Sequence, residues 1–364
     1  MKTAWIVGGV VVALLAFAII YPCLAPAGQI PSASGYTVLE AIRHGALTIF
    51  PVVAGSSHDT HEFITLDEGL RSGEVVVSES GSISPLVRPR HGDGVWHEGR
   101  RDGAQVNNLV LVNNSKRPLI LLAGEIVTGG KQDRIIGKDR LVPAESDPID
   151  LSVFCVEPGR WVGVSGNFRR TPGMVQPSVR SKAMADKDQG KVWAEVGSAR
   201  TAMASSLSPS ASETVEVTSS YAGVIGNSEV ERKLDAVAAP VEHDYQSLIA
   251  QLKDKNAVGV VVAVNGEIIW ADIFASSDLL AKYWPKLVRS YAAEAVTSQS
   301  RHAELDAKAA QQFLNQMEGR KQVVESEPGL FRHSETTGEG FQVFALTSLL
   351  PKTGFDLHIA KIAD

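Results

Sequence analysis

The sequence predicts an α+β protein. An N-terminal hydrophobic helix is followed by a mainly antiparallel, sandwich- or barrel-like β unit and then by a mixed region of helices and a β-hairpin. Three observations carry this prediction. The chain begins with a long uncharged apolar run. Short apolar segments divided by turn residues fill its first half. Segments with helical periodicity dominate the second half.

The N-terminal segment MKTAWIVGGVVVALLAFAIIYPCLAPAG has no charged residue after Lys2. Residues 4–24 are long enough to cross the roughly 30 Å apolar core of a bilayer as a helix. In this interpretation, residues 1–27 are a single-pass membrane anchor, and Lys2 keeps the N-terminus in the cytoplasm. In the alternative interpretation they are a signal peptide cleaved near Ala27, which closes a small-x-small site. Both interpretations export the rest of the chain to the cell envelope, and cleavage would leave it secreted or periplasmic.

A short tether and a β-rich part are expected next. Residues 28–36 combine Gly, Pro and Ser, a composition typical of a flexible connection. The β-rich part is predicted to span residues 37–205 and to carry the candidate site. Strands are expected at residues 45–53, at both ends of 63–80 around a helical turn, and at 108–114, 118–127, 140–144 and 149–157. A helix-prone stretch then covers residues 178–206.

The remaining part, residues 206–364, is predicted to be mixed α/β and to pack on the first. Its Ser/Pro/Thr-rich start at 206–216 is expected to be a loop. Asn265-Gly266 between two apolar runs predicts a β-hairpin with a type I′ turn. Helices are expected at 230–252 with an interruption at Pro240, at 276–298, and near 303–318. The segments FQVFAL and FDLHIAKI are expected to be the closing strands.

Composition excludes several classes of protein. The net charge of −6 argues against a general nucleic-acid binder, which needs a surface that neutralises phosphates. The chain has two cysteines, Cys23 in the leader and Cys155, so a disulfide framework and a cysteine-rich zinc site are both excluded. The spacing of the histidines between His58 and His97 fits no standard metal motif, and we predict no metal site.

Two glutamates are the candidate catalytic residues. Because side chains alternate along a strand, Glu125 ends the apolar row of PLILLAGE, and Glu157 ends that of IDLSVFCVE. If the two strand ends are neighbours, the carboxylates meet at the mouth of an apolar core. Proximity and burial would then raise the pKa of at least one carboxyl, as acid and base catalysis near neutral pH requires.

Cations and glycines surround both glutamates in the sequence. We predict that Lys131, Arg134 and Arg160 hold an anion, such as a carboxylate or a phosphate. Gly129-Gly130 would expose backbone N–H groups to the same anion. Gln132 would orient the ligand, and Trp161 would stack on it. The alternative is a structural network of glutamates and arginines that ties strand ends together.

Several segments together resemble a known family. They are AGEIVTGGKQDR, VPA, CVEPGRW, the pair VW at 192–193, and GVVVAVNGEIIWADIF with the helix that contains Trp284. The chain resembles the ADP-ribosylglycohydrolase and rhodanese-phosphatase-superfamily-associated protein domain, a bacterial family of unknown function, over roughly residues 40–300. The resemblance implies a link to ADP-ribose or nucleotide-derived substrates, and it brings no set of catalytic residues.

These observations predict an envelope-facing domain that binds a small anionic ligand of the nucleotide or ADP-ribose type. A second hypothesis is a hydrolase of such a ligand that uses Glu125 and Glu157. A third is a structural or partner-binding envelope module without a small-molecule site. The sequence names no cofactor, and its only predicted membrane contact is through residues 4–24.

Overall fold

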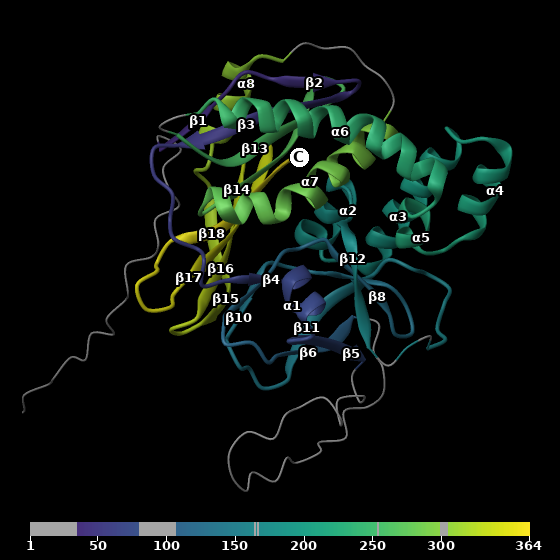
Figure 1. Cartoon of the computed structure of the whole chain (residues 1–364), viewed down its shortest axis with the longest axis horizontal. Coiled ribbons are helices and arrows are strands. Elements are labelled where there is room, and N and C mark those ends of the chain that lie inside the picture. Colours follow the sequence, from purple (N-terminus) through teal and green to yellow (C-terminus); the bar gives the residue numbers. More distant parts are fainter. Residues whose placement is uncertain (1–34, 80–106, 164, 166, 253–254, 299–304) are drawn as a thin grey trace, which may run out of the picture.

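The computed structural model describes residues 35–79, 107–163, 165, 167–252, 255–298 and 305–364 (Figure 1). The predicted N-terminal helix and nearly all of the tether lie outside these residues. The described part confirms an α+β fold with mainly antiparallel sheets. No helix within it is long and apolar enough to cross a bilayer.

The larger sheet has nine strands and draws them from both ends of the chain. Its order is β1 (Tyr36–Val38), β3 (Leu47–Ala54), β13 (Asn256–Val264), β14 (Glu267–Phe274), β18 (Asp356–Ala363), β17 (Phe341–Ser348), β16 (Phe331–Gly338) and β15 (Arg320–Glu327), with β2 (Ile42–His44) also on β3. All its pairs are antiparallel. The first strands of the predicted β-rich part therefore share a sheet with strands of residues 206–364.

The second sheet is barrel-like. Its order is β12 (Phe168–Met174), β8 (Glu125–Gly129), β9 (Arg134–Ile136), β11 (Ile149–Cys155), β6 (Asn108–Asn113) and β5 (Val75–Glu79). A bridge between Ser78 and Asn167 links its two ends, so the sheet nearly closes on itself. Beside it lies a three-stranded sheet of β10 (Arg140–Val142), β7 (Leu119–Leu121) and β4 (Ile64–Thr65).

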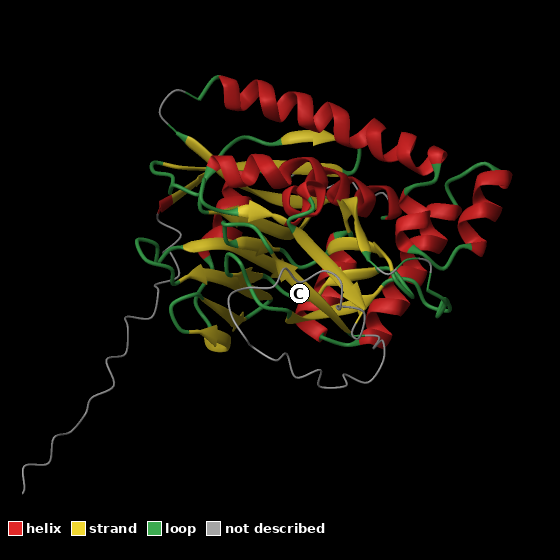
Figure 2. Cartoon of the chain, turned by 60° about the horizontal axis from the view of Figure 1, so that its bottom comes forward, coloured by secondary structure: helices red, strands yellow, loops and turns green. Residues whose placement is uncertain are grey.

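The described helices pack on both faces of the nine-stranded sheet and against the barrel-like sheet. They are α1 (Leu66–Ser72), α2 (Pro177–Ser181), the π-helix η2 (Lys182–Asp186), α3 (Gln189–Ala204), α4 (Pro209–Val217), α5 (Tyr221–Ile225), α6 (Ser228–Ala250), α7 (Ser277–Thr297) and α8 (Ala307–Asn315). Helices α6 and α7 pack against each other, and both contact the nine-stranded sheet, α6 at β2 and β3 and α7 at β13 and β14 (Figures 1 and 2). Trp284 of α7 stacks on Tyr245 of α6 with ring centroids 4.1 Å apart, in the largest apolar core.

The local turn and cap chemistry confirms two sequence predictions. Strands β13 and β14 form the expected hairpin, and Asn265 and Gly266 both have positive φ values, 54° and 79°, as a type I′ turn requires. The Oγ of Ser276 accepts a hydrogen bond from the N–H of Leu279 and caps α7.

Two helix predictions are wrong. The expected loop at 206–216 contains α4, because Pro209 occupies its first turn, where a missing N–H costs nothing. The expected interruption at Pro240 is absent, and α6 runs through it. Ala238, Val241 and Tyr245 of α6 are buried in the largest core, and this packing offsets the hydrogen bond that Pro240 cannot make.

Candidate functional site

Glu157 lies in a loop after β11 with its carboxylate occupied. Its Oε1 accepts a hydrogen bond from Arg160 Nε at 2.7 Å, and its Oε2 accepts from Arg160 Nη2 at 2.5 Å. The backbone N–H of Asp133 also donates to Oε2, at 2.9 Å. Glu157 is 7% exposed. A bidentate arginine and a backbone donor therefore satisfy this carboxylate within the protein.

The glycine pair belongs to the same loop cluster. Gly129 and Gly130 have φ values of 127° and 52°, and a Cβ on Gly130 would lie 2.4 Å from the ring of Phe168, so this position favours glycine. The N–H of Gly129 donates to Asp133 Oδ1 at 3.1 Å, and that of Gly130 donates to Ser165 Oγ at 3.3 Å. The donors predicted to hold a ligand anion thus bind side chains of the protein instead.

The other predicted ligand-binding residues surround this loop. Gln132 donates to the carbonyl of Glu157 at 3.0 Å. Lys131 Nζ lies 5.0 Å and Arg134 Cζ 5.9 Å from the centroid of the Trp161 ring. Trp161 is 43% exposed, so its ring covers the cluster at the surface. The structure therefore brings together Glu157 and the residues predicted around it in one densely bonded loop cluster.

Glu125 lies away from this cluster. Strands β8 and β11 both pair antiparallel with β9, so they run parallel to each other. Glu125 is the first residue of β8, whereas Glu157 follows the end of β11. The length of β8 separates Glu125 from Gly129 in the loop cluster, about 13 Å at the usual rise of a strand. The two glutamates therefore occupy opposite ends of the barrel-like sheet and have different partners.

Glu125 belongs to a carboxylate–lysine–carboxylate group with the buried Lys286 of α7 and the partly buried Asp67 of α1. Lys286 Nζ lies 2.7 Å from Glu125 Oε1 and 2.7 Å from Asp67 Oδ2. Glu125 is 1% exposed, and burial raises its pKa. Burial lowers the pKa of Lys286, but the two carboxylates outweigh burial and hold that pKa above its usual value. Lys286 therefore stays protonated and is unsuited to act as a nucleophile.

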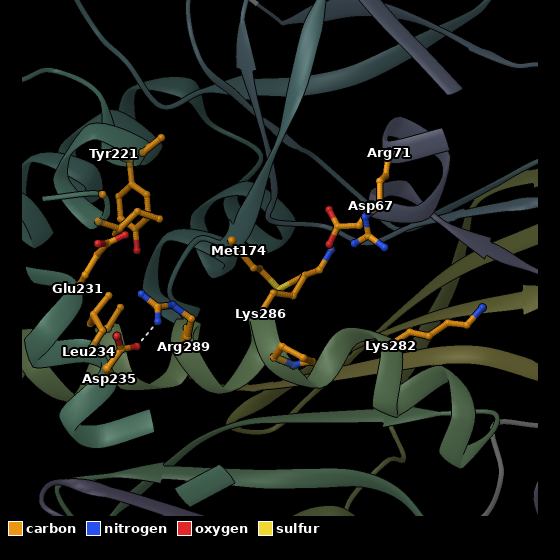
Figure 3. Close-up of a pocket in the computed structure, with 16 residues that line it drawn as sticks. Asp67, Arg71, Met174, Tyr221, Glu231, Leu234, Asp235, Lys282, Lys286 and Arg289 are labelled. Atoms are coloured by element: carbon orange, nitrogen blue, oxygen red, sulfur yellow. Dashed lines mark hydrogen bonds and ion pairs between the residues drawn. The ribbon is translucent and has the colours of Figure 1, made fainter. Parts of the chain in front are cut away.

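A cavity of about 570 Å³ opens beside Lys286 (Figure 3). Helices α1, α5, α6 and α7 and strand β12 contribute its walls. Lys282, Lys286 and Arg289 lie on one face of α7, at spacings of four and three residues, and Arg71 of α1 adds a fourth cation. Sequence reasoning missed this site, although the spacing of the three cations along the predicted helix was a usable signal.

The cations of the cavity differ in their partners. Lys282 forms an ion pair with Glu68 at 3.0 Å, and Arg289 forms one with Asp235 (Figure 3). Arg71 is exposed, and none of the residues that the structure describes binds its side chain. Glu231 also lines the cavity without a described partner for its carboxylate. The cavity thus offers both a free cation and a free carboxylate.

A fully buried network of charged side chains contacts the turn that precedes Glu125. Both guanidinium Nη atoms of Arg180 donate to Asp272, at 3.0 and 3.1 Å. His358 bridges two carboxylates, with Nε2 at 3.0 Å from Asp272 and Nδ1 at 2.6 Å from Asp139. Tyr291 donates its hydroxyl to Asp272. All five side chains have no solvent exposure. The signal in the sequence was that Asp272 and His358 are each flanked by apolar residues inside the strand segments EIIWADIF and FDLHIAKI.

This network holds the turn that precedes Glu125. The N–H of Ala123 donates to Asp139 at 2.8 Å, and the carbonyl of Ala123 accepts from Arg180 Nε at 3.2 Å. Because Asp272 and His358 belong to the nine-stranded sheet, the network joins that sheet to the strand that carries Glu125. It therefore has a structural part in placing the Glu125–Lys286 pair beside the cavity.

His358 predicts a loss of stability at alkaline pH. Burial lowers its pKa, but Asp139 and Asp272 outweigh burial and raise that pKa to about 9. The folded state then binds a proton more tightly than the unfolded state, whose histidine titrates near 6.5. The stabilisation that protonated His358 gives to the folded state is complete below about pH 6.5. It is lost as pH rises through 9, a change of roughly 3 kcal/mol in the free energy of unfolding.

Urea unfolding between pH 6 and 10 measures this change, with His358→Gln as the control. Lys361 acts in the opposite direction above pH 8, because burial lowers its pKa to about 8. Both proteins contain Lys361, so its effect cancels when the free energy of unfolding of the variant is subtracted from that of wild type at each pH. We expect the variant to lose the alkaline decline. Equal slopes in the two proteins would show that His358 is not charged in the folded state.

Cys155 and the histidines between His58 and His97 are the remaining candidates, and His91 and His97 lie outside the described residues. Cys155 is fully buried, and burial raises the pKa of its thiol, as the apolar face of β11 predicted. Within the part of the chain that the structure describes, no group of three or more His, Cys, Asp and Glu side chains is arranged to hold a metal ion.

The fold and the cavity together define an α+β protein with a polar cavity of ligand size. The family model of the ARG and Rhodanese-Phosphatase-superfamily-associated Protein domain matches residues 35–359. The chain therefore belongs to this family, which confirms the resemblance found in its sequence. No curated protein and no solved structure matches the chain.

Proposed function

We propose that this protein binds a small phosphorylated sugar, of the nucleotide or ADP-ribose type, in the cavity between α1, α6 and α7. The observation that carries the proposal is the combination of free Arg71 and free Glu231 in one cavity of about 570 Å³. This volume lies within the roughly 300–1,000 Å³ that is usual for small-molecule sites.

The chemistry of the walls favours a sugar phosphate over a simple anion. Arg71 would bind a phosphate, because a guanidinium matches phosphate oxygens in a bidentate geometry. Glu231 would accept hydrogen bonds from sugar hydroxyls, as carboxylates do in nucleotide-binding proteins. A purely anionic ligand would leave Glu231 without a hydrogen-bond donor and would be repelled by it, whereas Asp67 and Asp235 are already paired with Lys286 and Arg289.

The apolar part of the cavity suits a base or another flat group. Met174, Ile225, Leu234 and Ala293 line it next to the polar walls. Ligand sites commonly combine such an apolar surface with a few polar groups that fix orientation. The family description adds support through its first word, ARG, which stands in the place of ADP-ribosylglycohydrolase in the family name that the sequence resembles.

The arrangement of the glutamates supports binding more than hydrolysis by two carboxylates. Glu125 is bound by Lys286, and Glu157 is bound by Arg160 at the other end of the sheet. A substrate bond cannot lie between an acid and a base so placed. Anchoring through residues 4–24, or export after cleavage near Ala27, is part of the same proposal and rests on the uncharged N-terminal run.

Calorimetric titration of the full chain with ADP-ribose and with AMP tests the proposal. We expect binding of at least one ligand, and we expect Arg71→Gln to weaken it about tenfold or more, since a hydrogen bond to a charged group contributes roughly 1.5–3 kcal/mol. Arg232→Gln is the matched control, because Arg232 is exposed on α6 and lies outside the cavity lining. It should leave affinity unchanged.

Arg160→Gln distinguishes the cavity from the loop cluster. If the ligand occupies the cavity, this change should leave its affinity within about twofold, provided that circular dichroism shows an intact fold. Loss of binding in Arg160→Gln together with full binding in Arg71→Gln would move the site to the loop cluster. Absence of binding by both ligands would overturn the proposed function.

A further inference from the structure

Strand β15 ends the nine-stranded sheet with an open edge. It pairs with β16 on one side, and the order of described strands stops there. Seven of its eight residues are exposed, so the described part of the chain leaves most of both faces uncovered. An open edge of this kind presents backbone N–H and C=O groups to which another strand can be added.

The sequence of β15, RKQVVESE, is complementary to itself. Its N-terminal half is basic, its C-terminal half is acidic, and Val323 and Val324 lie at the centre with exposures of 49% and 39%. When two such strands run antiparallel about a two-fold axis near the valines, the basic half of each faces the acidic half of the other. Opposite charges on neighbouring strands stabilise such a pair.

We propose that β15 pairs antiparallel with β15 of a second copy of this chain, which forms a two-fold dimer with a continuous sheet. Arg320 and Glu327 at the strand ends are exposed, and no described side chain forms an ion pair with either. In the dimer, Arg320 of one copy lies near Glu327 of the other. A parallel arrangement would place like charges together and is disfavoured.

The size of the contact predicts a weak dimer. The pairing of β15 with β16 has a β-bulge between Val323 and Glu325, which bends the strand and shortens its regular edge. Glu325 is already bound by Lys138 and Arg140. One strand edge buries less than the roughly 1,200–2,000 Å² of a stable complex, so we expect dissociation at about micromolar concentration.

Sedimentation velocity of the full chain in a neutral detergent tests the dimer. Wild type should pass from monomer to dimer as its concentration rises to about 100 µM, well above the micromolar dissociation expected for so small a contact. Arg320→Glu alone and Glu327→Arg alone should each weaken association about tenfold or more, because each places like charges opposite each other. An equimolar mixture of the two variants should form a mixed dimer, since all of its facing charges are then opposite. The double variant should also dimerise.

The association of wild type, the single variants, their mixture and the double variant is compared. Arg320 and Glu327 are both exposed, so the substitutions should leave the fold unaffected. A wild type that stays monomeric would overturn the proposal. Association that persists unchanged in both single variants would overturn it too, because the contact would then lie elsewhere, for example in the N-terminal segment. Failure of the mixture to associate, while wild type does, would exclude the antiparallel arrangement.

Discussion

Asp272→Asn is expected to lower the free energy of unfolding by about 3–5 kcal/mol, the usual effect of removing one partner from a buried ion pair. The change leaves Arg180 and protonated His358 with one carboxylate, Asp139, in a region without solvent exposure. Burial alone disfavours every charge in the group, so stability depends on complete pairing. The pKa of Asp272 lies far below its usual range, because Arg180 and His358 outweigh the effect of burial.

Urea unfolding at pH 7 measures this effect, and Asp235→Asn provides the matched control. Asp235 also pairs with an arginine, Arg289, but its side chain is 55% exposed. An exposed pair contributes about 0–1 kcal/mol, so the control should change stability little. Similar losses in the two variants would show that the buried network does not contribute more than a surface pair.

Lys286→Met is expected to lower stability by a comparable amount, about 3–5 kcal/mol. The change leaves the carboxylate of Glu125 buried without its cation. Because burial raises the pKa of Glu125, the folded state of the variant should take up a proton. Its stability should therefore recover as pH falls and decline further as pH rises.

A double variant isolates the cause of this loss. Glu125→Gln removes the buried charge, so Lys286→Met combined with Glu125→Gln should be more stable at pH 7 than Lys286→Met alone. Urea unfolding at pH 5 and pH 8 supplies the comparison. If the double variant is no more stable than the single one, lost packing of the lysine stem explains the effect better than an unpaired carboxylate.

Local signals predicted the parts of the fold that depend on neighbours in sequence. Asn265-Gly266 fixed the hairpin because both residues accept positive φ, and Ser276 marked the start of α7. The loop cluster was also predictable, since Gly129 and Arg160 lie close to strand ends that pair through β9. Pro209 and Pro240 led to wrong predictions of a loop and of a helix interruption. Proline fits the first turn of a helix, where Pro209 lies, and strong packing can hold a helix through an internal proline such as Pro240.

The rest could not be predicted because it depends on contacts between distant segments. Alternation misplaced Glu125, because a turn divides the predicted strand 118–127 into β7 and β8, and Glu125 begins β8 instead of ending an apolar row. Glu157 follows the end of β11 as expected, and the parallel direction of β8 and β11 puts the two glutamates at opposite ends of the sheet. The cavity needs Arg71 of α1 beside α7, two elements far apart in the chain. Asp272 and His358 meet only because β14 pairs with β18.

A crystal structure of the full chain with ADP-ribose would test the central claim most directly. We predict electron density for the ligand between α1, α6 and α7, with a phosphate on Arg71 and sugar hydroxyls near Glu231. We also expect Lys286 to remain between Glu125 and Asp67, since its pairing does not depend on the ligand. Ligand density on Trp161 in the loop cluster, with the cavity beside α7 empty, would contradict the account.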